Sequence, residues 1–230
     1  MKKPKIFIAC DTRSQKTIKK IIAQSQTNEL EIGFKFGLEF LYTKNGRNFI
    51  SKIKKNNIFA DYKISDIPST SSAAIKSLKD LKNLSYITVH VSSGYECLRE
   101  VKKVAKKINK KLKVLGVTVL TSFSNTSIKQ IGHTRPIKDI VKRQALLAKS
   151  AGLDGIVCSG YEAKFLKKIC KRMEIITPGI RLKGQTLDDQ KRVKSPREAF
   201  KSGATSIVMG RSLIKGNIKR NIRKLIKSLN

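Results

Sequence analysis

Residues 61–70, Asp-Tyr-Lys-Ile-Ser-Asp-Ile-Pro-Ser-Thr, place two carboxylates around one lysine at the end of an apolar run. Residues 58–60, Ile-Phe-Ala, lead into this segment as a buried strand would, and side chains two positions apart on a strand share a face. Asp61 and Lys63 should therefore project side by side, and Asp66 follows after the strand has ended. This arrangement indicates catalysis and not packing.

A second lysine extends the pattern, because Lys35 lies near the end of the preceding predicted strand. Any one of these charges alone would be a solvated side chain at a strand end, but a set that projects into one confined space would not. Carboxylates placed close together raise each other's pKa unless cations lie between them, so alternating signs allow Lys35, Asp61, Lys63 and Asp66 all to stay ionised. A preorganised array of this kind suits a reaction that builds up negative charge on carbon.

Two glycine turns near the end of the chain are typical of a phosphate site. Residues 177–181, Thr-Pro-Gly-Ile-Arg, and 208–212, Val-Met-Gly-Arg-Ser, each combine a glycine with an arginine. Arginine donates to phosphate in a bidentate manner, and exposed backbone amides add fixed positive dipoles. Either turn alone could be a tight turn with a surface arginine, but their occurrence after adjacent strands favours phosphate binding. The polar loop 182–189, which ends at Gln190, is expected to close over the phosphate as a lid.

Short runs rich in Ile and Val alternate with amphipathic segments along the whole chain, which predicts repeated strand-helix units around a parallel sheet. Eight units in 230 residues match a (β/α)₈ TIM barrel. An open doubly wound sheet is the alternative, but the first strand is not followed by G-x-G-x-x-G. The expected strands are Ile6–Cys10, Glu31–Phe36, Ile58–Lys63, Tyr86–Val91, Leu112–Leu120, Gly155–Cys158, Ile175–Thr177 and Ser206–Met209.

Polar residues fall near the carboxyl ends of these strands, where the active sites of such barrels lie. Asp11 and Lys35 mark the first two strands, Asp61 and Lys63 the third, and His90 lies near the end of the fourth. The residues that follow the later strands are Thr121, Gly179, Arg181, Gly210 and Arg211.

Two helix starts are also predicted. Residues 195–198, Ser-Pro-Arg-Glu, form a capping box with proline at the first helical position, and Gly203 should end that helix. After the third strand, Pro68 ends the extended segment, and Ser69 or Thr70 is expected to cap the next helix.

The composition favours one domain that covers residues 1–230, because 40% of the residues are hydrophobic and they are spread evenly. The formal charge of +34 would by itself point to nucleic acid or an anionic membrane. However, the lysines recur on the polar faces of predicted helices, which indicates a lysine-rich solvated surface. The chain has no Trp and only 6% aromatic residues, so no specific nucleic-acid partner is expected.

A cytoplasmic protein is expected, because the sequence shows neither a signal peptide nor an apolar run of the roughly 20 residues that a membrane helix needs. The four cysteines have no C-x-x-C spacing and are predicted to be reduced core thiols. With only two histidines, a structural zinc site is not expected.

The chain resembles the orotidine 5′-phosphate decarboxylase family over essentially its whole length, from Ile6 to Leu213. The most specific motif is Asp61-x-Lys63-x-x-Asp66-Ile67-Pro68-x-Thr70. It is supported, in the family's order, by Lys35-Phe-Gly37, Val89-His90, residues 117–122, Val157-Cys-Ser159, residues 177–181 and Gly210-Arg211.

The resemblance implies decarboxylation of orotidine 5′-monophosphate (OMP) to UMP, the last step of UMP synthesis, with neither a metal nor an organic cofactor. Lys63 would be the proton donor and Asp61 would lie against the substrate carboxylate, while Lys35 and Asp66 complete the array. Asp66 and Thr70 would act across a homodimer with shared active sites. The remaining implied contacts are Asp11 and Lys35 with the ribose, Thr121 and Ser122 with the pyrimidine, and Arg181, Gln190, Gly210 and Arg211 with the phosphate.

An alternative is a Mg²⁺-dependent sugar-phosphate enzyme of the same superfamily, a 3-keto-gulonate-phosphate decarboxylase or hexulose-phosphate synthase. That branch is similar in Asp-x-Lys-x-x-Asp but typically continues with Ala-Gly. Residues 67–70, Ile-Pro-Ser-Thr, resemble the orotidylate branch instead.

Overall fold

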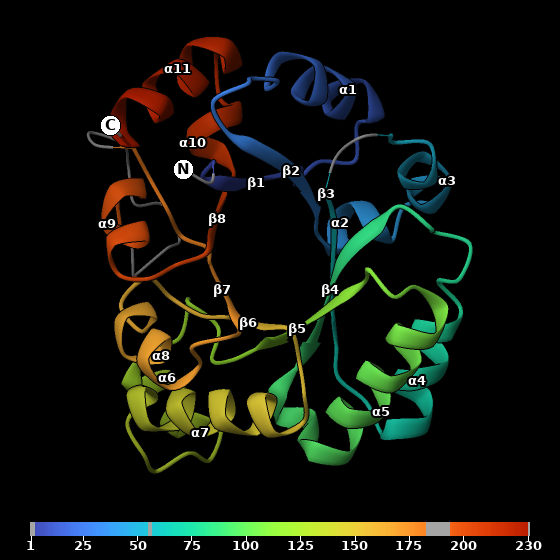
Figure 1. Cartoon of the computed structure of the whole chain (residues 1–230), viewed down its shortest axis with the longest axis vertical. Helices are drawn as coiled ribbons and strands as arrows, with labels where there is room; N and C mark the ends of the chain where they lie inside the picture. Colours follow the sequence, from blue (N-terminus) through green and yellow to red (C-terminus); the bar gives the residue numbers. More distant parts are fainter. Residues whose placement is uncertain (1–2, 55–56, 183–193, 230) are drawn as a thin grey trace.

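Eight parallel strands form a closed barrel in the computed structural model, which describes residues 3–54, 57–182 and 194–229 (Figure 1). Each strand pairs with the next in chain order, and β8 returns to β1. The predicted (β/α)₈ architecture is therefore confirmed. The strands are β1 Lys5–Ala9, β2 Glu31–Phe36, β3 Asn57–Ile64, β4 Leu84–His90, β5 Lys113–Val117, β6 Gly155–Val157, β7 Glu174–Thr177 and β8 Ser206–Met209.

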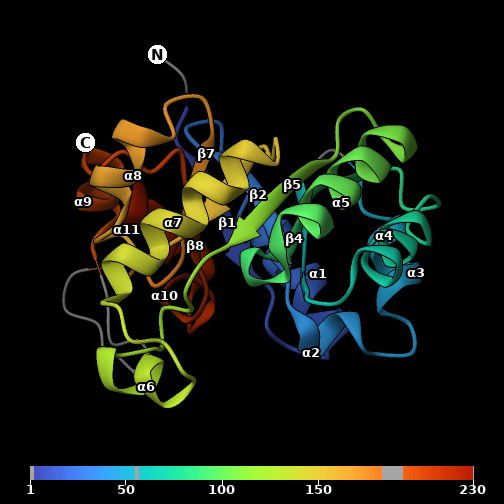
Figure 2. The same ribbon diagram turned by 90° about the horizontal axis from the view of Figure 1, so that it is seen from below.

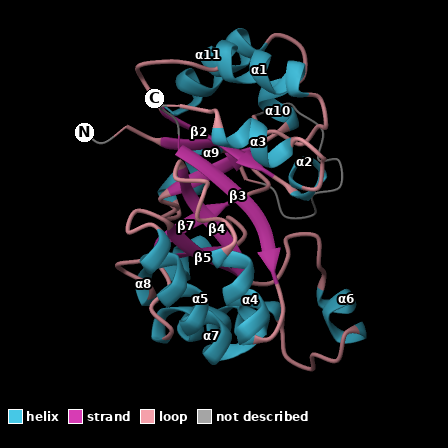
Figure 3. Cartoon of the chain, turned by 90° about the vertical axis from the view of Figure 1, so that its right-hand side faces the viewer, coloured by secondary structure: helices cyan, strands magenta, loops and turns pink. Residues whose placement is uncertain are grey.

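Helices surround the barrel, and short helices stand on the side where the strands end (Figures 2 and 3). In Figure 3 the helix α6 projects from the body at the lower right, apart from α2 and α10, which lie in the upper half of the view. The helices are α1 Gln15–Gln24, α2 Leu38–Leu41, α3 Gly46–Ser51, α4 Pro68–Lys76, α5 Gly94–Ile108, α6 Asn125–Gln130, α7 Ile137–Ser150, α8 Ala163–Ile169, α9 Pro196–Lys201, α10 Arg211–Ile214 and α11 Ile218–Leu229, with a 3₁₀ turn at Val91–Ser93.

The core has two layers because the strands are buried on both faces. The larger layer lies between the sheet and the helices. The smaller one fills the barrel, where the rings of Phe7, Phe59 and Tyr86 meet, with Phe7 centroids 5.3 Å from Phe59 and 5.1 Å from Tyr86. Burial of each such side chain stabilises the fold by about 1.5–3 kcal/mol.

A polar network closes the amino-terminal end of the barrel. Lys5 Nζ lies 2.9 Å from Glu31 Oε1 and donates to the Tyr86 hydroxyl at 3.0 Å. The Tyr86 hydroxyl in turn donates to Glu174 Oε2 at 3.1 Å, and Lys113 pairs with the same carboxylate. Since these side chains come from β1, β2, β4, β5 and β7, the network links five of the eight strands at the amino-terminal end, next to the aromatic layer.

The predicted boundaries of two elements need correction. Strand β5 ends at Val117 and not at Leu120, because the apolar residues that follow are buried as walls of a cavity and not as part of the ladder. Helix α4 begins at Pro68 with Ile67 as its N-cap, so Ser69 and Thr70 are inside the helix. Proline suits the first helical position since its fixed φ is helical and its missing N–H would have no partner there.

Helix α9 confirms the predicted capping box. The Ser195 hydroxyl accepts from Glu198 N at 3.4 Å, and Glu198 Oε2 accepts from Ser195 N at 2.9 Å. Gly203 follows the helix with φ of 98°, a conformation that side chains disfavour.

Candidate active site

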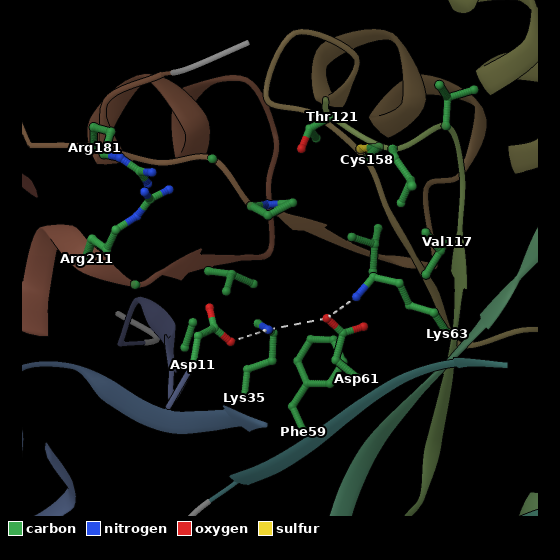
Figure 4. A pocket seen from close by; sticks show the side chains of 18 of the residues that line it. Asp11, Lys35, Phe59, Asp61, Lys63, Val117, Thr121, Cys158, Arg181 and Arg211 are labelled. Atoms are coloured by element: carbon green, nitrogen blue, oxygen red, sulfur yellow. Dashed lines mark hydrogen bonds and ion pairs between the residues drawn. The ribbon is translucent and has the colours of Figure 1, made fainter. Parts of the chain in front are cut away.

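A cavity of about 440 Å³ opens at the carboxyl ends of the strands (Figure 4). Its size is in the ordinary range for small-molecule sites. Eight of the predicted site residues line it: Asp11, Lys35, Asp61, Lys63, Thr121, Arg181, Gly210 and Arg211.

Four charged side chains form a continuous chain along one wall of this cavity (Figure 4). Lys35 Nζ lies 3.4 Å from Asp11 Oδ1 and 3.3 Å from Asp61 Oδ2. Lys63 Nζ lies 2.8 Å from the same Asp61 oxygen. The chain crosses the ends of β1, β2 and β3, so three neighbouring strands supply charges of alternating sign.

The two inner members of this chain have pKa values that keep them ionised. Burial alone would raise the pKa of Asp61, which is only 7% exposed, but the ammonium groups of Lys35 and Lys63 outweigh burial and lower it. Burial alone would lower the pKa of Lys35, yet the carboxylates of Asp61 and Asp11 raise it. Both groups are therefore charged at neutral pH, because the opposite charge of each compensates the cost of burying the other.

An irregularity in β3 aims Lys63 into the cavity. The pairing of β3 with β4 shifts between Ala60, opposite Ile87, and Ile64, opposite Val89. Among the described residues Lys63 is the one non-glycine residue with a positive φ, at 51°. Asp61 and Lys63 lie side by side as expected, but a bulge and not regular strand alternation brings them together.

Thr88 belongs to this wall, although sequence reasoning did not include it. Its hydroxyl accepts from the Lys63 backbone N–H at 2.9 Å and donates to Asp61 Oδ1 at 2.9 Å. The signal in the sequence was a threonine between the apolar residues Ile87 and Val89 of β4, at a position that is completely buried.

Two arginines define the opposite end of the cavity. Arg181 follows β7, Arg211 begins α10, and Figure 4 shows their guanidinium groups directed towards each other. Gly179 has φ of 73°, so its turn requires glycine. The pairing of two guanidinium groups with glycine turns suits an anion with several oxygens.

The walls between these ends are mainly apolar. Phe59, Val117 and Val119 line them together with the buried thiol of Cys158 and the side chain of Thr121. Such walls fit a flat, weakly polar ring between the arginines and the charge chain.

Three of the described predicted site residues do not line this cavity. Asp66, Thr70 and Ser122 are exposed or partly exposed and are not among the residues that line it. The Asp66 carboxylate instead accepts from the Ile67 backbone N–H at 2.7 Å, next to the start of α4. Gln190 and nearly all of the predicted lid lie outside the described residues.

A membrane-spanning helix and a metal cluster are both absent from the part of the chain that the structure describes. Within residues 3–54, 57–182 and 194–229, no helix is both long and apolar enough to cross a membrane. In these described ranges, no three His, Cys, Asp or Glu side chains are grouped so that they could hold a metal ion.

A closed parallel barrel with a charged cavity at the carboxyl ends of its strands defines a (β/α)₈-barrel enzyme. Residues 4–224 match the model of the orotidine 5′-phosphate decarboxylase / HUMPS family. The chain belongs to that family, as the sequence motifs predicted.

Similar proteins agree with this assignment. Orotidine 5′-phosphate decarboxylase of the Wolbachia from Brugia malayi is 40% identical over 229 residues, which cover 97% of this chain and 98% of that one. The Coxiella burnetii (strain RSA 493 / Nine Mile phase I) protein of the same name is 37% identical over 91% of this chain and 89% of its own. The crystal structure of orotidine 5′-phosphate decarboxylase from Lactobacillus acidophilus superposes with a TM-score of 0.84 at 27% identity, with full coverage of both chains.

Proposed function

We propose that this protein decarboxylates OMP to UMP, the last step of de novo pyrimidine synthesis, without a metal or an organic cofactor. The observation that carries the proposal is the unbroken chain Asp11–Lys35–Asp61–Lys63, which shares one cavity with Arg181 and Arg211. The names of the relatives at about 40% identity support the same activity.

Substrate binding is assigned from the two ends of the cavity. The phosphate lies between Arg181 and Arg211, where the Gly210 backbone is close to the bound oxygens, and Gln190 from the lid completes this site. Asp11 and Lys35 hold the ribose hydroxyls. Thr121 contacts the pyrimidine ring from the cavity wall, which places the reacting carbon beside Asp61 and Lys63. The resemblance also assigns the neighbouring Ser122 to the ring, although Ser122 is exposed and outside the cavity lining in this structure.

The reaction itself needs one proton donor. The bond between ring carbon C6 and the carboxylate breaks, carbon dioxide leaves, and the electron pair stays on C6. The Lys63 ammonium stabilises that negative charge as it forms and then transfers a proton to C6, after which Lys63 regains a proton from water. Because Asp61 already holds Lys63 at 2.8 Å, the ammonium is oriented before the substrate arrives.

The active unit is proposed to be a homodimer with shared sites. Asp66 and Thr70 are exposed beside Ile67, whose side chain is 62% exposed, and Tyr42 is 81% exposed after the preceding strand. Contiguous patches of exposed apolar side chains mark protein–protein contacts, and we propose that these two residues belong to one. In the dimer, Asp66 and Thr70 enter the cavity of the neighbouring subunit, and Asp66 completes the alternating charge array there.

Residues 1–230 are proposed to form one catalytic domain in the cytoplasm. The four cysteines, Cys10, Cys97, Cys158 and Cys170, are buried and free, which supports a reducing compartment.

The test is turnover of OMP by the purified full chain in EDTA, followed as loss of orotidylate absorbance and as formation of UMP. We expect turnover in EDTA at the same rate as with added Mg²⁺. No loss of absorbance, or a loss that appears only after Mg²⁺ is restored, would overturn the proposal, and the second result would favour the sugar-phosphate branch.

A further inference from the structure

Thr88 occupies the one position of β4 that faces the irregular part of β3. Ala60 pairs with Ile87 and Ile64 pairs with Val89, so the three residues 61–63 are opposite Thr88 alone. The ladder is interrupted there, and the Lys63 backbone N–H has the Thr88 hydroxyl as its partner in place of a carbonyl.

The hydroxyl has a fixed direction of donation. Since Thr88 Oγ1 accepts from Lys63 N, its single proton is directed to Asp61 Oδ1, 2.9 Å away. Asp61 Oδ2 then receives the Lys63 ammonium at 2.8 Å. The three residues form a closed hydrogen-bonded ring in which Thr88 connects the backbone of Lys63 to the carboxylate that holds its side chain.

Thr88 is completely buried and does not line the cavity, so it does not touch a bound substrate. Its two hydrogen bonds instead act on the backbone of Lys63 and on the orientation of the Asp61 carboxylate. One bond supports the left-handed backbone of Lys63, a conformation that persists only where the surrounding structure holds it in place. The other fixes the rotation of the Asp61 carboxylate.

From this geometry we infer that Thr88 is a positioning residue for the proposed decarboxylation, which sets the direction of the Lys63 ammonium through its backbone and through Asp61. The inference rests on the proposed function, and it adds a buried neutral residue behind the charged side chains of this wall.

The pKa of Asp61 provides a way to detect the loss of the Thr88 hydroxyl, and it depends on the charged groups around Asp61. Lys35 pairs with Asp61 from β2 and Lys63 pairs with it from β3, while Asp11 on the β1 side binds Lys35. His90, at the end of β4, interacts electrostatically with both Asp61 and Lys63. Lys35 and Lys63 keep the pKa of Asp61 low against burial, and the Thr88 hydroxyl adds to them. Removal of the hydroxyl should therefore raise the Asp61 pKa while both lysines remain.

The experiment compares Thr88→Val, which removes the hydroxyl at nearly constant shape, with Thr88→Ser, which keeps it. Thr118→Val is the matched control, because Thr118 is 2% exposed and its hydroxyl donates to the Val157 carbonyl at 2.9 Å, outside the charge chain. We expect kcat of Thr88→Val to fall about 100-fold with little change in KM, as for a displacement of roughly 1 Å in a reacting group. Thr88→Ser should recover most of this loss, and Thr118→Val should keep wild-type kcat.

A measurement without turnover separates this inference from the proposed function. Carbon-13 NMR of aspartate-labelled protein, with Asp61→Asn to assign the signal, should show the Asp61 carboxyl titrating at higher pH in Thr88→Val than in wild type or Thr88→Ser. If wild type did not consume OMP, the proposed function would fail while this titration still tested Thr88. An unchanged Asp61 titration, equal kcat losses in Thr88→Val and Thr118→Val, or no recovery with serine would each overturn the positioning role.

Discussion

Asp61 accepts from three groups with its two oxygens. Lys35 and Lys63 share Oδ2, and Thr88 binds Oδ1. Removal of one partner from a buried ion pair usually destabilises a protein by about 3–5 kcal/mol, because a charge is left without compensation. Here two partners remain after the loss of the third, so single substitutions at the lysines should leave a folded protein whose chemistry can be measured.

Replacement of Lys63 tests the proton donor. Lys63→Ala should abolish turnover of OMP, because the other ammonium of this wall, Lys35, is held between two carboxylates, while UMP still binds through the arginines at the far end of the cavity. Steady-state kinetics and calorimetric titration of UMP check the two halves of this prediction. Lys107→Ala, on the exposed face of α5, is the control and should retain full activity. Near-normal turnover of Lys63→Ala would show that the acid is assigned wrongly.

Replacement of Arg211 tests the anion end. Arg211→Ala removes a charge-assisted contact of roughly 1.5–3 kcal/mol, so the affinity for UMP should fall about 10- to 100-fold. The affinity for uridine, which lacks the phosphate, should change little. Arg197→Ala on the exposed side of α9 serves as the control. Equal losses for UMP and uridine would mean that Arg211 does not act through the phosphate.

Residue identity was easier to predict from the sequence than residue geometry. Asp61 and Lys63 were recognisable because packing alone rarely places a charged pair directly after a buried apolar run, and their spacing survives the bulge. Thr88 was not found, since a threonine inside a strand is ordinary and its importance depends on an irregularity in a different strand. Asp66 could be named from its motif, but only the structure shows that its side chain is exposed in the single chain.

At the scale of elements, the barrel depends on helix ends that hold the strands in order. Helix α9 lies between β7 and β8 in the chain, and its capping box satisfies two backbone N–H groups that otherwise have no partner in the helix. The same box was predictable from four residues, whereas the start of α4 was not, because proline and the hydroxyl residues after it each suit more than one position.

The capping box of α9 provides a test of stability. Ser195→Ala should lower the free energy of unfolding by about 1 kcal/mol, because the Glu198 N–H loses its acceptor. Denaturation in urea checks this value. Ser51→Ala is the control, since the Ser51 hydroxyl donates to the Asn48 carbonyl within an exposed part of α3. A loss for Ser195→Ala no larger than for Ser51→Ala would mean that the cap contributes nothing measurable.

At the scale of the whole molecule, most of the positive charge is remote from the cavity. Helices α1 and α11 pack against each other and contain no acidic residue, and their exposed cations include Lys19, Lys20, Arg223 and Lys224. The cavity by contrast combines four cations with two carboxylates, which gives it a net charge of +2. That charge suits one phosphate dianion, so the large surplus of lysine is a property of the surface and not of the site.

The fold was largely predictable, because every strand of a closed parallel barrel is buried on both faces and therefore appears as an apolar run. The same rule explains the error in β5, where Val119 is buried in the cavity wall although it is outside the ladder. The pattern of apolar residues in the sequence indicates which residues are buried, and it does not show which of them pair in the sheet. The proposed homodimer rests on the family resemblance and not on periodicity, since the exposure of Tyr42 and Ile67 emerges only after folding.

A shared active site makes a prediction that no single chain could satisfy. Lys63→Ala and Asp66→Asn should each be inactive alone. If Asp66 acts in the neighbouring subunit's cavity, a hybrid of the two variants contains one site with both substitutions and one with neither. Random mixing should then restore about a quarter of wild-type activity, because half of the dimers are hybrids and each has one intact site.

The matched control combines Lys63→Ala with Asp61→Asn, since these two residues lie 2.8 Å apart in one chain and every hybrid site then retains one substitution. That mixture should stay inactive. Asp61 and Lys63 of one cavity come from the same chain, and every chain in the mixture carries one of the two substitutions. Exchange is verified in both mixtures by mass spectrometry of differently tagged subunits. Inactivity of the Lys63→Ala and Asp66→Asn mixture after verified exchange would exclude the shared site, and recovery in the control mixture would show that the activity arises from something other than complementary cavities.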